Sequence, residues 1–303
     1  MRDTFVKTFL EISRKDKNVL LVTGDLGFGV LNDIWKEIPN QIINVGIAEQ
    51  NMIGFASGLA KSGKTVYVYS IANFPSLRPL EQIRNDAAYH NLNVKIVSVG
   101  EGFSYGSLGM THHATEDVAI IRAIPNIRIY SPFSDEDATF TINESYILNG
   151  PAYIRISRTS VKHNINFSNN LKRGVPLLIS NKSNIAIIAN GNIVEEVLLA
   201  YEKLKLSNQK VDVLLFHTLK PIETIELSLL LKNYNKIFVV QEQTIYGGLS
   251  SIIKDSLLPG YPSNIYTIGI NDRFTSEVGD ASYLRKINKL DSNSIIDFIH
   301  NEK

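Results

Sequence analysis

Cysteine is absent from the 303-residue chain, which excludes disulfide bonds, a thiolate nucleophile and any cysteine-ligated zinc or iron–sulfur site. The sequence also has no run of about 18 apolar residues, so we expect no membrane span. It shows no excess of either charge: 31 Lys and Arg stand against 30 Asp and Glu. This balance gives no electrostatic basis for binding nucleic acid or a membrane surface. The N-terminal segment lacks the continuous apolar stretch of a secretory signal. We therefore expect a cytoplasmic, metal-poor protein.

The composition is that of a globular α/β protein with sizeable cores. Hydrophobic residues make up 44% of the chain and charged residues 20%, which excludes disorder as the main state. A length of 303 residues is large for one domain and suits two of ordinary size.

The segment 1–160 alternates apolar, β-rich runs with helical patterns. Several runs lack polar alternation, which is typical of strands covered on both faces. Apolar residues from Met52 to Leu59 recur at the spacing of one face of a helix that begins at Glu49. This order predicts a parallel sheet with helices on both faces. The predicted strands are 19–22, 41–45, 65–69, 94–99, 127–130 and 152–156, and the further helices are 80–88, 116–124 and one from Asp135.

Residues 161–180 are rich in Asn and Ser and contain Gly174-Val175-Pro176, which predicts a linker between two domains. The alternation restarts in 181–303 and predicts a second, smaller α/β domain. Its predicted strands are 185–189, 211–216, 236–240 and 265–268, and its predicted helices are 193–204, 222–231 and one after Gly248.

The junction between the run 41–45 and the helix that begins at Glu49 is the most informative site. Ligands of a parallel sheet bind at the carboxyl ends of its strands, and Glu49 lies there among apolar residues and Gly46. A carboxyl group in such a tight, partly dry junction is suited to hydrogen-bonding a ligand. The alternative is an acid that only stabilises the first turn of the helix.

Gly54 and Gly58 lie one turn apart on the same predicted helix. Each glycine costs about 1 kcal/mol of helix stability relative to alanine. Close approach of another helix across a subunit contact would explain them, and simple tolerance of glycine is the alternative.

A glycine-rich segment, residues 100–113, follows the run 94–99 and ends on His112 and His113. Its glycines form neither GxGxxG nor GxxxxGK[ST], so a phosphate-cradling loop is not supported. Adjacent residues on a helix point about 100° apart, so the two histidines suit a shared metal site poorly. We favour one histidine facing the cleft as a proton-handling or hydrogen-bonding group. Two surface histidines are the alternative.

Two further charged residues follow predicted strands. Asp25 lies at the carboxyl end of the first strand, as a turn residue or a ligand contact. Arg158 follows the sixth strand, where a guanidinium could clamp an anionic substrate or simply face solvent.

Three segments together resemble the pyrimidine-binding domain of transketolases: GIAEQNMIGFASGLA, EQIRNDAAYHNLNVKIVSVGEGF and THHATEDVAIIRAIPNIRIYSPFSD. The downstream segments FHTLKPI, VVQEQTIYGGLSS and GINDRF look like the transketolase C-terminal domain. The resemblance covers almost the whole chain in order. The chain is most similar to the C-terminal subunit of a split transketolase, whose two halves are separate polypeptides. The 1-deoxyxylulose 5-phosphate synthases and the β subunits of 2-oxo-acid dehydrogenases are more distant relatives that share GIAEQ.

The resemblance implies a thiamine-diphosphate-dependent enzyme that transfers a two-carbon ketol unit from a ketose donor to an aldehyde acceptor. It implies that Glu49 hydrogen-bonds the aminopyrimidine ring of the cofactor and favours its imino form. The resulting imine generates the reactive carbanion of the cofactor.

Other residues match family positions by the same resemblance. Phe74 matches the aromatic residue that stacks on the aminopyrimidine, and Ile71 falls where the family usually has another aromatic residue. His112 matches the histidine beside the reacting carbon, and Arg158 matches an arginine that binds the terminal phosphate of the substrate. Asp25 matches an acidic residue near the cofactor.

Departures from the family pattern fall mainly on substrate recognition. Leu108 replaces an aspartate that contacts substrate hydroxyls, and His113 replaces a common glutamine. Gly100 and Gly29 stand where many transketolases carry a phosphate-binding His and Ser. We therefore expect a specialised sugar or sugar-phosphate substrate, contacted by Arg158 and by the segment that contains Leu108, His112 and His113.

The family's diphosphate-binding motif, Gly-Asp-Gly followed by an asparagine, does not occur in this sequence. The resemblance then implies that an N-terminal transketolase subunit mainly holds the diphosphate and Mg²⁺, and that this chain supplies no metal ligand. We expect an α2β2 heterotetramer in which this chain also contacts a second copy of itself.

Two other functions stay open. An E1 β-type subunit of a 2-oxo-acid dehydrogenase shares GIAEQ, but the His-Ser-Gln stretch usual in that family is missing here. A non-catalytic scaffold subunit would tolerate Leu108 and Ile71, whereas Glu49, Phe74 and His112 argue against it.

Overall fold

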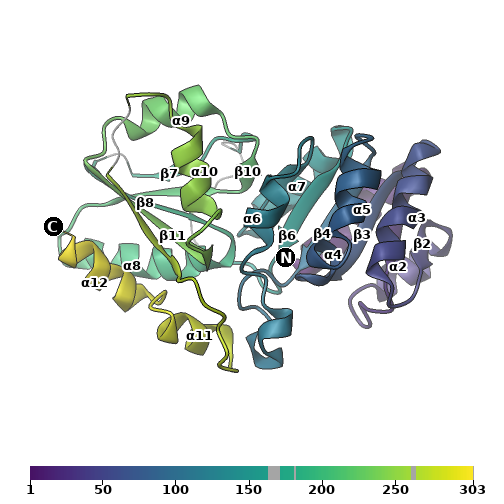
Figure 1. The fold of residues 1–303 in the computed structure, drawn as a ribbon, viewed down its shortest axis with the longest axis horizontal. Coiled ribbons are helices and arrows are strands. Elements are labelled where there is room, and N and C mark those ends of the chain that lie inside the picture. The colour runs from purple at the N-terminus through teal and green to yellow at the C-terminus, as the bar shows by residue number, and fades with distance from the viewer. Residues whose placement is uncertain (163–170, 181, 261–263, 303) are drawn as a thin grey trace.

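The structure is a computed structural model that describes residues 1–162, 171–180, 182–260 and 264–302. It consists of two α/β units that lie side by side, each built on its own sheet (Figure 1). No helix within these ranges is long and apolar enough to cross a membrane.

The first sheet is parallel except at one edge. Its strands are β1 (Val19–Thr23), β2 (Ile42–Asn44), β3 (Thr65–Ile71), β4 (Val94–Val99), β5 (Arg128–Tyr130), β6 (Ala152–Ile156) and β10 (Thr218–Lys220). Their order is β10-β5-β6-β4-β3-β1-β2, and β10 pairs with β5 in the antiparallel sense. Every residue of β1, β4 and β6 is buried, as expected for strands with helices on both faces.

Helices cover both faces of this sheet, which confirms the predicted fold. They are α1 (Arg2–Lys15), α2 (Asn32–Glu37), α3 (Glu49–Lys61), α4 (Phe74–Leu77), α5 (Leu80–Gln82), the π-helical turn η2 (Ile83–Ala88), α6 (Asp117–Arg122) and α7 (Asp135–Ile147). Apolar residues of α1, α2 and α7 pack on one face. Those of α3, η2 and α6 pack on the other. Short 3₁₀ turns η3 (Gly106–Leu108) and η4 (Met110–His112) lie in the glycine-rich segment.

The second unit repeats this arrangement on a smaller scale. Its strands are β7 (Leu177–Ile179), β8 (Ile185–Asn190), β9 (Asp212–Phe216), β11 (Lys236–Thr244) and β12 (Ile265–Ile270). Its helices are α8 (Val194–Leu206), α9 (Thr224–Leu231), α10 (Leu249–Ser256), α11 (Ala281–Ile287) and α12 (Ser292–Asn301). The strand order is β12-β11-β8-β9-β7, and β7 pairs with β9 in the antiparallel sense.

Two short strands depart from the predicted division of the chain. The strand β7 lies inside the segment 161–180 that we expected to be a linker, so the second sheet begins before residue 181. The strand β10 follows β9 in the chain, yet it extends the first sheet rather than the second. The two units are therefore interleaved in sequence.

The contact between the two units contains a hydrophobic cluster and a buried polar centre. One hydrophobic cluster joins buried residues of α3 and α6 to buried residues of α9 and α10. A polar centre lies at Glu101, just after β4. The Glu101 carboxylate accepts hydrogen bonds from Ser131 Oγ (2.9 Å) and from the backbone N–H of Asn192 in the second unit (2.7 Å). Arg155 Nη1 lies 3.0 Å from the same carboxylate.

Candidate functional site

The site lies at the carboxyl edge of the first sheet, where α3 begins directly after β2. Gly46 takes a positive φ of 75° in this turn, a conformation that glycine adopts without strain. The turn leads to Glu49, the first residue of α3. Parallel strands bring their carboxyl ends to one edge, so the ends of β1, β3 and β4 lie near the same place.

The Glu49 carboxylate is buried and forms an ion pair with Arg78. The Glu49 side chain is 4% exposed, whereas that of Arg78 is 47% exposed. Arg78 Nη1 donates to both carboxylate oxygens of Glu49 at 2.9 Å. A buried carboxylate needs such a partner because burial without one is costly. Glu49 therefore does more than stabilise the first turn of α3, because Arg78 holds its side chain in a defined orientation.

Phe74, Arg78 and His112 form an aromatic and cationic cluster beside this pair. The guanidinium carbon of Arg78 lies 3.9 Å from the centre of the Phe74 ring, which is a close cation–π contact. The ring centres of Phe74 and His112 are 5.0 Å apart, with the rings edge to face. The structure therefore brings Glu49, Phe74 and His112 together, as the sequence led us to expect.

His112 is oriented by its neighbour and carries a shifted pKa. Thr111 Oγ1 lies 3.0 Å from His112 Nδ1. Partial burial, and then the positive charge of Arg78, lower the pKa of His112 below its usual value. Both effects favour the neutral imidazole near pH 7, which is the form that can accept a proton.

Ile71 ends β3 and is half-buried, and the chain then turns sharply toward Phe74. Ala72 takes a positive φ of 40°. Asn73 Nδ2 donates to the Thr111 carbonyl at 3.0 Å. This hydrogen bond joins the segment that carries Phe74 to the segment that carries His112.

The glycine-rich segment places its two histidines in different surroundings. His113 is buried, with 4% of its surface exposed, and packs edge to face on Phe103 at 5.1 Å between ring centres. Leu108, which we expected near the substrate, is 54% exposed in the turn η3. His112 thus faces the cluster, while His113 points into the protein.

Arg158 lies apart from Glu49, at a cavity between the two units. The cavity measures about 230 Å³, and Arg2 and Arg285 line it as well. The guanidinium of Arg158 lies 5.1 Å from the ring centre of Tyr105, which belongs to the glycine-rich segment. Arg2 Nε is buried without a hydrogen-bond partner among the described residues. Arg285 forms ion pairs with Glu242 and with Glu195, which also lines the cavity. The guanidinium groups of Arg158 and Arg2 are therefore the ones suited to an anionic group.

Gly100 explains one departure from the family pattern. It takes a positive φ of 95°, and the Tyr105 ring fills the space that a side chain at residue 100 would need. A histidine does not fit there. The same ring lies under Arg158, so Tyr105 contributes to the surroundings of the candidate anion site instead.

Asp25 lies in the exposed turn after β1, with a φ of 56°. Asn44, the last residue of β2, holds this turn: its Oδ1 accepts from the backbone N–H of Asp25 at 2.9 Å and from that of Gly46 at 3.0 Å. Asn44 therefore ties Asp25 to the turn that leads to Glu49.

Sequence reasoning missed Arg78 and Arg2. A signal for Arg78 was available, because it follows Phe74 by four residues, the spacing at which side chains meet on one face of a helical segment. Arg2 offered no such signal, since α1 brings it to the cavity only through the packing of α1 on the sheet.

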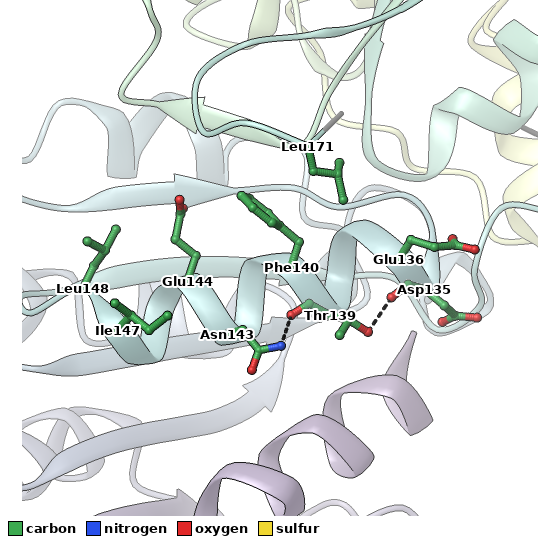
Figure 2. Close-up of a pocket in the computed structure, with 9 residues that line it drawn as sticks. All are labelled: Asp135, Glu136, Thr139, Phe140, Asn143, Glu144, Ile147, Leu148 and Leu171. Atoms are coloured by element: carbon green, nitrogen blue, oxygen red, sulfur yellow. Dashed lines mark hydrogen bonds between the residues drawn. The ribbon is translucent and has the colours of Figure 1, made fainter. Parts of the chain in front are cut away.

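A second, larger cavity of about 810 Å³ runs along the outer face of α7 and includes none of these residues (Figure 2). It is lined by apolar side chains such as Phe140, Ile147 and Leu171, with Glu136 and Glu144 among them. The described residues also contain no group of three or more His, Asp or Glu side chains suited to hold a metal ion.

Two family descriptions match the chain. Residues 1–163 match "Transketolase, pyrimidine binding domain", and residues 176–295 match "Transketolase, C-terminal domain". These matches confirm the resemblance seen in the sequence.

Curated relatives include proteins that are named as single subunits of transketolases. The chain is 34% identical to one of the subunits of the apulose-4-phosphate transketolase of Phocaeicola vulgatus, over 89% of this chain and 87% of that protein. It is 31% identical to the 6-deoxy-6-sulfo-D-fructose transketolase subunit SqwH of Clostridium sp. strain MSTE9, over 99% and 93%. The 1-deoxy-D-xylulose-5-phosphate synthase of Azobacteroides pseudotrichonymphae is 30% identical, and the match covers 48% of that longer protein.

Solved structures agree. A protein described as "Split gene transketolase, inactive beta4 tetramer" has a TM-score of 0.87 and 26% identity, with 99% of this chain and 96% of that chain covered. The transketolase of Campylobacter jejuni has a TM-score of 0.83 at 16% identity, with 99% and 46% covered, which shows the fold alone.

Proposed function

The chain belongs to the transketolase family, and from that premise we propose that it is the pyrimidine-binding subunit of a split, thiamine-diphosphate-dependent transketolase. The enzyme is a transferase that moves a two-carbon ketol unit from a ketose donor to an aldehyde acceptor. The observation that carries the proposal is the convergence of Glu49, Phe74 and His112 at one edge of the first sheet.

The residues present fit the aminopyrimidine half of the cofactor that the family uses. A carboxylate has about four acceptor positions, and the two hydrogen bonds from Arg78 leave acceptor capacity on Glu49. Phe74 offers an aromatic face, and the half-exposed Arg78 can leave that face without unfolding a helix or strand. When bound, thiamine diphosphate supplies the electron sink for breaking and forming the carbon–carbon bond.

The residues of this chain then bind and orient the cofactor and the substrate, and they transfer protons. Glu49 binds a ring nitrogen and fixes its protonation. His112 faces the reacting centre as a neutral imidazole and accepts or returns a proton at a substrate hydroxyl. Asp25 lies near the cofactor because Asn44 holds the turn that contains Asp25. Ile71 forms a wall of the pyrimidine pocket.

The substrate is a specialised sugar with an anionic end. Arg158 and Arg2 line one cavity and suit a phosphate or sulfonate group. Two relatives are named for sugars with such groups, apulose 4-phosphate and 6-deoxy-6-sulfo-D-fructose. Leu108 and Met110 carry exposed apolar side chains in the same short segment as His112, and by the resemblance Leu108 replaces an aspartate that contacts substrate hydroxyls. This change favours a donor with fewer hydroxyls or differently placed ones.

We assign the diphosphate and its divalent metal to a separate N-terminal transketolase subunit. Exposed apolar side chains occur in segments that follow the strands of the first sheet and on α3, which supports a protein contact on this part of the molecule, since exposed apolar surface marks interaction sites. They are Phe28, Ile47, Phe55, Leu77 and Leu108. Gly58 lies on the exposed side of α3 with open space beside it, which leaves room for another helix, whereas Gly54 faces Asp86 of η2 in the same chain. These features fit an α2β2 heterotetramer in which two copies of this chain also touch.

Calorimetric titration of thiamine diphosphate with Mg²⁺ tests the shared site. The titration uses the full chain alone, a candidate N-terminal transketolase subunit from the same organism alone, and the mixture. We expect binding at micromolar affinity only in the mixture. Tight binding by this chain alone would overturn the shared site. Turnover of a 2-oxo acid with a lipoyl acceptor by the mixture, and none with ketose donors, would instead establish the dehydrogenase-type function.

A further inference from the structure

The loop that carries His112 depends on contacts with the rest of the protein. Residues 101–114, the His112 loop, contain three glycines, and glycine loses more conformational freedom on folding than any other residue. The loop is closed by Gly102 and Ala114, whose backbone N–H groups each donate to the other's carbonyl at 3.0 Å. His112 lies two residues before this closure and packs on Phe74. The position of Ala114 therefore bears directly on that of His112.

Arg155, in β6, binds the closing end of the loop. Arg155 Nη2 donates to the Ala114 carbonyl at 3.1 Å, and the same oxygen accepts from Gly102. Arg155 also donates to Asp117, the first residue of α6, from Nε to Oδ2 at 2.7 Å and from Nη2 to Oδ1 at 3.2 Å. One guanidinium thus joins the end of the His112 loop to the helix that follows it.

The same side chain binds the opening end of the loop. Arg155 Nη1 lies 3.0 Å from Glu101 Oε2 and donates to Ser131 Oγ at 3.2 Å. Together with the bonds to Ala114 and Asp117, these contacts use all three guanidinium nitrogens. The side chains of Arg155, Glu101 and Asp117 are each at most 2% exposed. Buried charges need partners of opposite sign and hydrogen bonds, and this arrangement supplies both.

Glu101 extends these contacts to the second unit. Glu101 Oε1 accepts from the backbone N–H of Asn192 at 2.7 Å, and Asn190 Nδ2 donates to Ser131 Oγ at 2.9 Å. The Glu101 carboxylate also fills the space where a side chain at Gly191 would lie, so the turn between Asn190 and Asn192 packs directly on it. The second unit therefore reaches the His112 loop through the partners of Arg155.

We propose that Arg155 is a positioning residue for the transfer reaction: it fixes both ends of the His112 loop and joins them, through Glu101, to the second unit. The proposal rests on the proposed function only in the role given to His112. Arg155 acts through the loop, because all three of its guanidinium nitrogens are engaged inside the protein. A purely structural role would instead stabilise the whole fold without a particular effect on His112.

Hydrogen exchange on the isolated full chain separates the two roles without any turnover. Arg155→Lys keeps the positive charge in the network, but one ammonium nitrogen cannot span the acceptors that three guanidinium nitrogens reach. We expect the amides of Gly102, His112 and Ala114, which are hydrogen-bonded within the loop, to exchange at least tenfold faster. Those of β3 and β8 should stay within about threefold of wild type. An unchanged loop, or equal acceleration in the loop and the strands, would overturn the proposal.

Arg128→Lys is the matched control. Arg128 begins the neighbouring strand β5 and also holds backbone carbonyls, those of residues 148–150. This variant makes the same chemical change outside the network around Arg155. Exchange in the His112 loop should stay within about threefold of wild type. Acceleration of the loop equal to that in Arg155→Lys would overturn the proposal.

Glu101→Gln tests the same network from its other side. Four donors converge on the Glu101 carboxylate, two on each oxygen, so an amide in its place puts an N–H group against some of them. We expect the His112 loop to exchange at least tenfold faster, with β3 and β8 protected. This variant decides between the two roles if the strands lose protection in Arg155→Lys. Loss of strand protection in both variants would show a structural role and overturn the proposal.

Readouts at His112 and in turnover complete the test. In Arg155→Lys, the pKa of His112 followed by NMR should rise toward that of a free histidine, since a loosened loop is better hydrated and lies farther from Arg78. In the enzyme reconstituted with the N-terminal subunit, kcat should fall at least tenfold, and the KM for the ketose donor should stay within about threefold. Arg128→Lys should keep kcat within about twofold of wild type.

The outcomes distinguish this proposal from the proposed function. An unmoved pKa of His112, or an unchanged kcat beside a loosened loop, would overturn the positioning role of Arg155. Loop exchange and His112 titration as expected, without turnover in any form including wild type, would overturn the proposed function and leave the placement of His112 by Arg155 standing.

Discussion

Glu49 and Arg78 are joined through a single guanidinium nitrogen that lies 2.9 Å from both carboxylate oxygens. The acid is buried and the base is half-exposed. The pair therefore compensates the burial of the acid from the solvent side. It also leaves acceptor positions of the acid unused.

Removal of Arg78 should destabilise the chain. Arg78→Met leaves a buried carboxylate without its donor, and hydrogen bonds to charged groups contribute about 1.5–3 kcal/mol. Because Arg78 is half-exposed, we expect the free energy of unfolding to fall by about 1–2 kcal/mol. Urea unfolding measures this loss as a lower midpoint at constant m-value. Arg84→Met changes an exposed arginine in the neighbouring π-helical turn and should stay within about 0.5 kcal/mol of wild type. Equal effects of the two substitutions would contradict the role of the pair.

Glu49→Gln should abolish turnover and leave the fold intact. A carboxylate that sets the protonation of a reacting ring contributes roughly 100- to 10,000-fold to rate. We expect kcat of the enzyme reconstituted with the N-terminal subunit to fall at least 100-fold, while circular dichroism and association with the partner stay unchanged. Full association with unaltered turnover in the variant would instead support a scaffold role for this chain.

Arg158 should act on substrate binding rather than on the chemical step. Arg158→Gln removes a guanidinium beside the cavity that Arg2 also lines. Loss of a charge-assisted bond worth about 1.5–3 kcal/mol corresponds to a 10- to 150-fold higher KM for an anionic donor, with kcat nearly unchanged. Arg158→Lys keeps the charge without the bidentate geometry, so its KM should lie between those of wild type and Arg158→Gln. A neutral donor should be insensitive to both substitutions, and equal losses for neutral and anionic donors would refute an anion site.

Lys95 should make stability rise with pH above neutrality. It is fully buried in β4 and donates to the carbonyls of Leu148 and Gly150. Burial, assisted by the charge of Arg128, lowers the pKa of Lys95 from 10.5 to about 6. Between these values the unfolded chain binds one more proton than the folded chain, so stability grows with pH by up to about 1.4 kcal/mol per unit.

Lys95→Met isolates this effect from those of other groups. Burial also lowers the pKa of Lys220 and raises the pKa of tyrosines such as Tyr67 and Tyr130. These groups act on both chains alike, so the informative quantity is the difference, and wild type should gain stability relative to Lys95→Met from pH 7.5 to 9.5. We expect the difference between their urea-derived stabilities to change by about 1 kcal/mol per pH unit. Arg128 Nη2 still satisfies the Leu148 and Gly150 carbonyls in the variant. Parallel pH profiles would show that Lys95 stays protonated in the folded chain.

Restoring the family residues at two glycines should have unequal costs. Both positions take a positive φ, 80° at Gly29 and 95° at Gly100, but the space around Gly29 is open, whereas the Tyr105 ring fills that around Gly100. Backbone strain alone costs about 1–3 kcal/mol. Gly29→Ser should lower the free energy of unfolding by about 1 kcal/mol. Gly100→His should lower it by more than about 3 kcal/mol because Tyr105 must also move. Thermal or urea unfolding compares them directly, and similar losses would contradict this account of residue 100.

Most of the fold was predictable because strands buried on both faces leave long apolar runs. The run 94–99 was predicted with the bounds that β4 has. The strand β10 was missed because three residues carry too short a pattern, and its partner β5 lies far away in sequence. Nothing local indicates that a segment after β9 returns to the first sheet. Such pairings depend on how the two units dock.

The clustering of Glu49, Phe74 and His112 was predictable because their positions and their side-chain chemistry pointed to the same edge of the sheet. Glu49 stands at a strand-to-helix junction, and the motifs around it indicated Phe74 and His112. Arg78 was missed since an exposed arginine is ordinary in isolation, and only its contact with a buried acid distinguishes it. His112 and His113 have different surroundings in a segment closed by the Gly102–Ala114 backbone pair, and no helical or strand periodicity encodes such a pair.

The return of β10 to the first sheet also limits how the chain can be divided. Residues 1–160 expressed alone would leave the outer edge of β5 with unpaired N–H and C=O groups, because β10 would be missing. Open edges of this kind promote strand-to-strand aggregation. The first unit therefore needs a strand from the second half of the chain to complete its sheet. Any fusion or exchange of domains in this chain must keep residues 218–220 together with the first sheet.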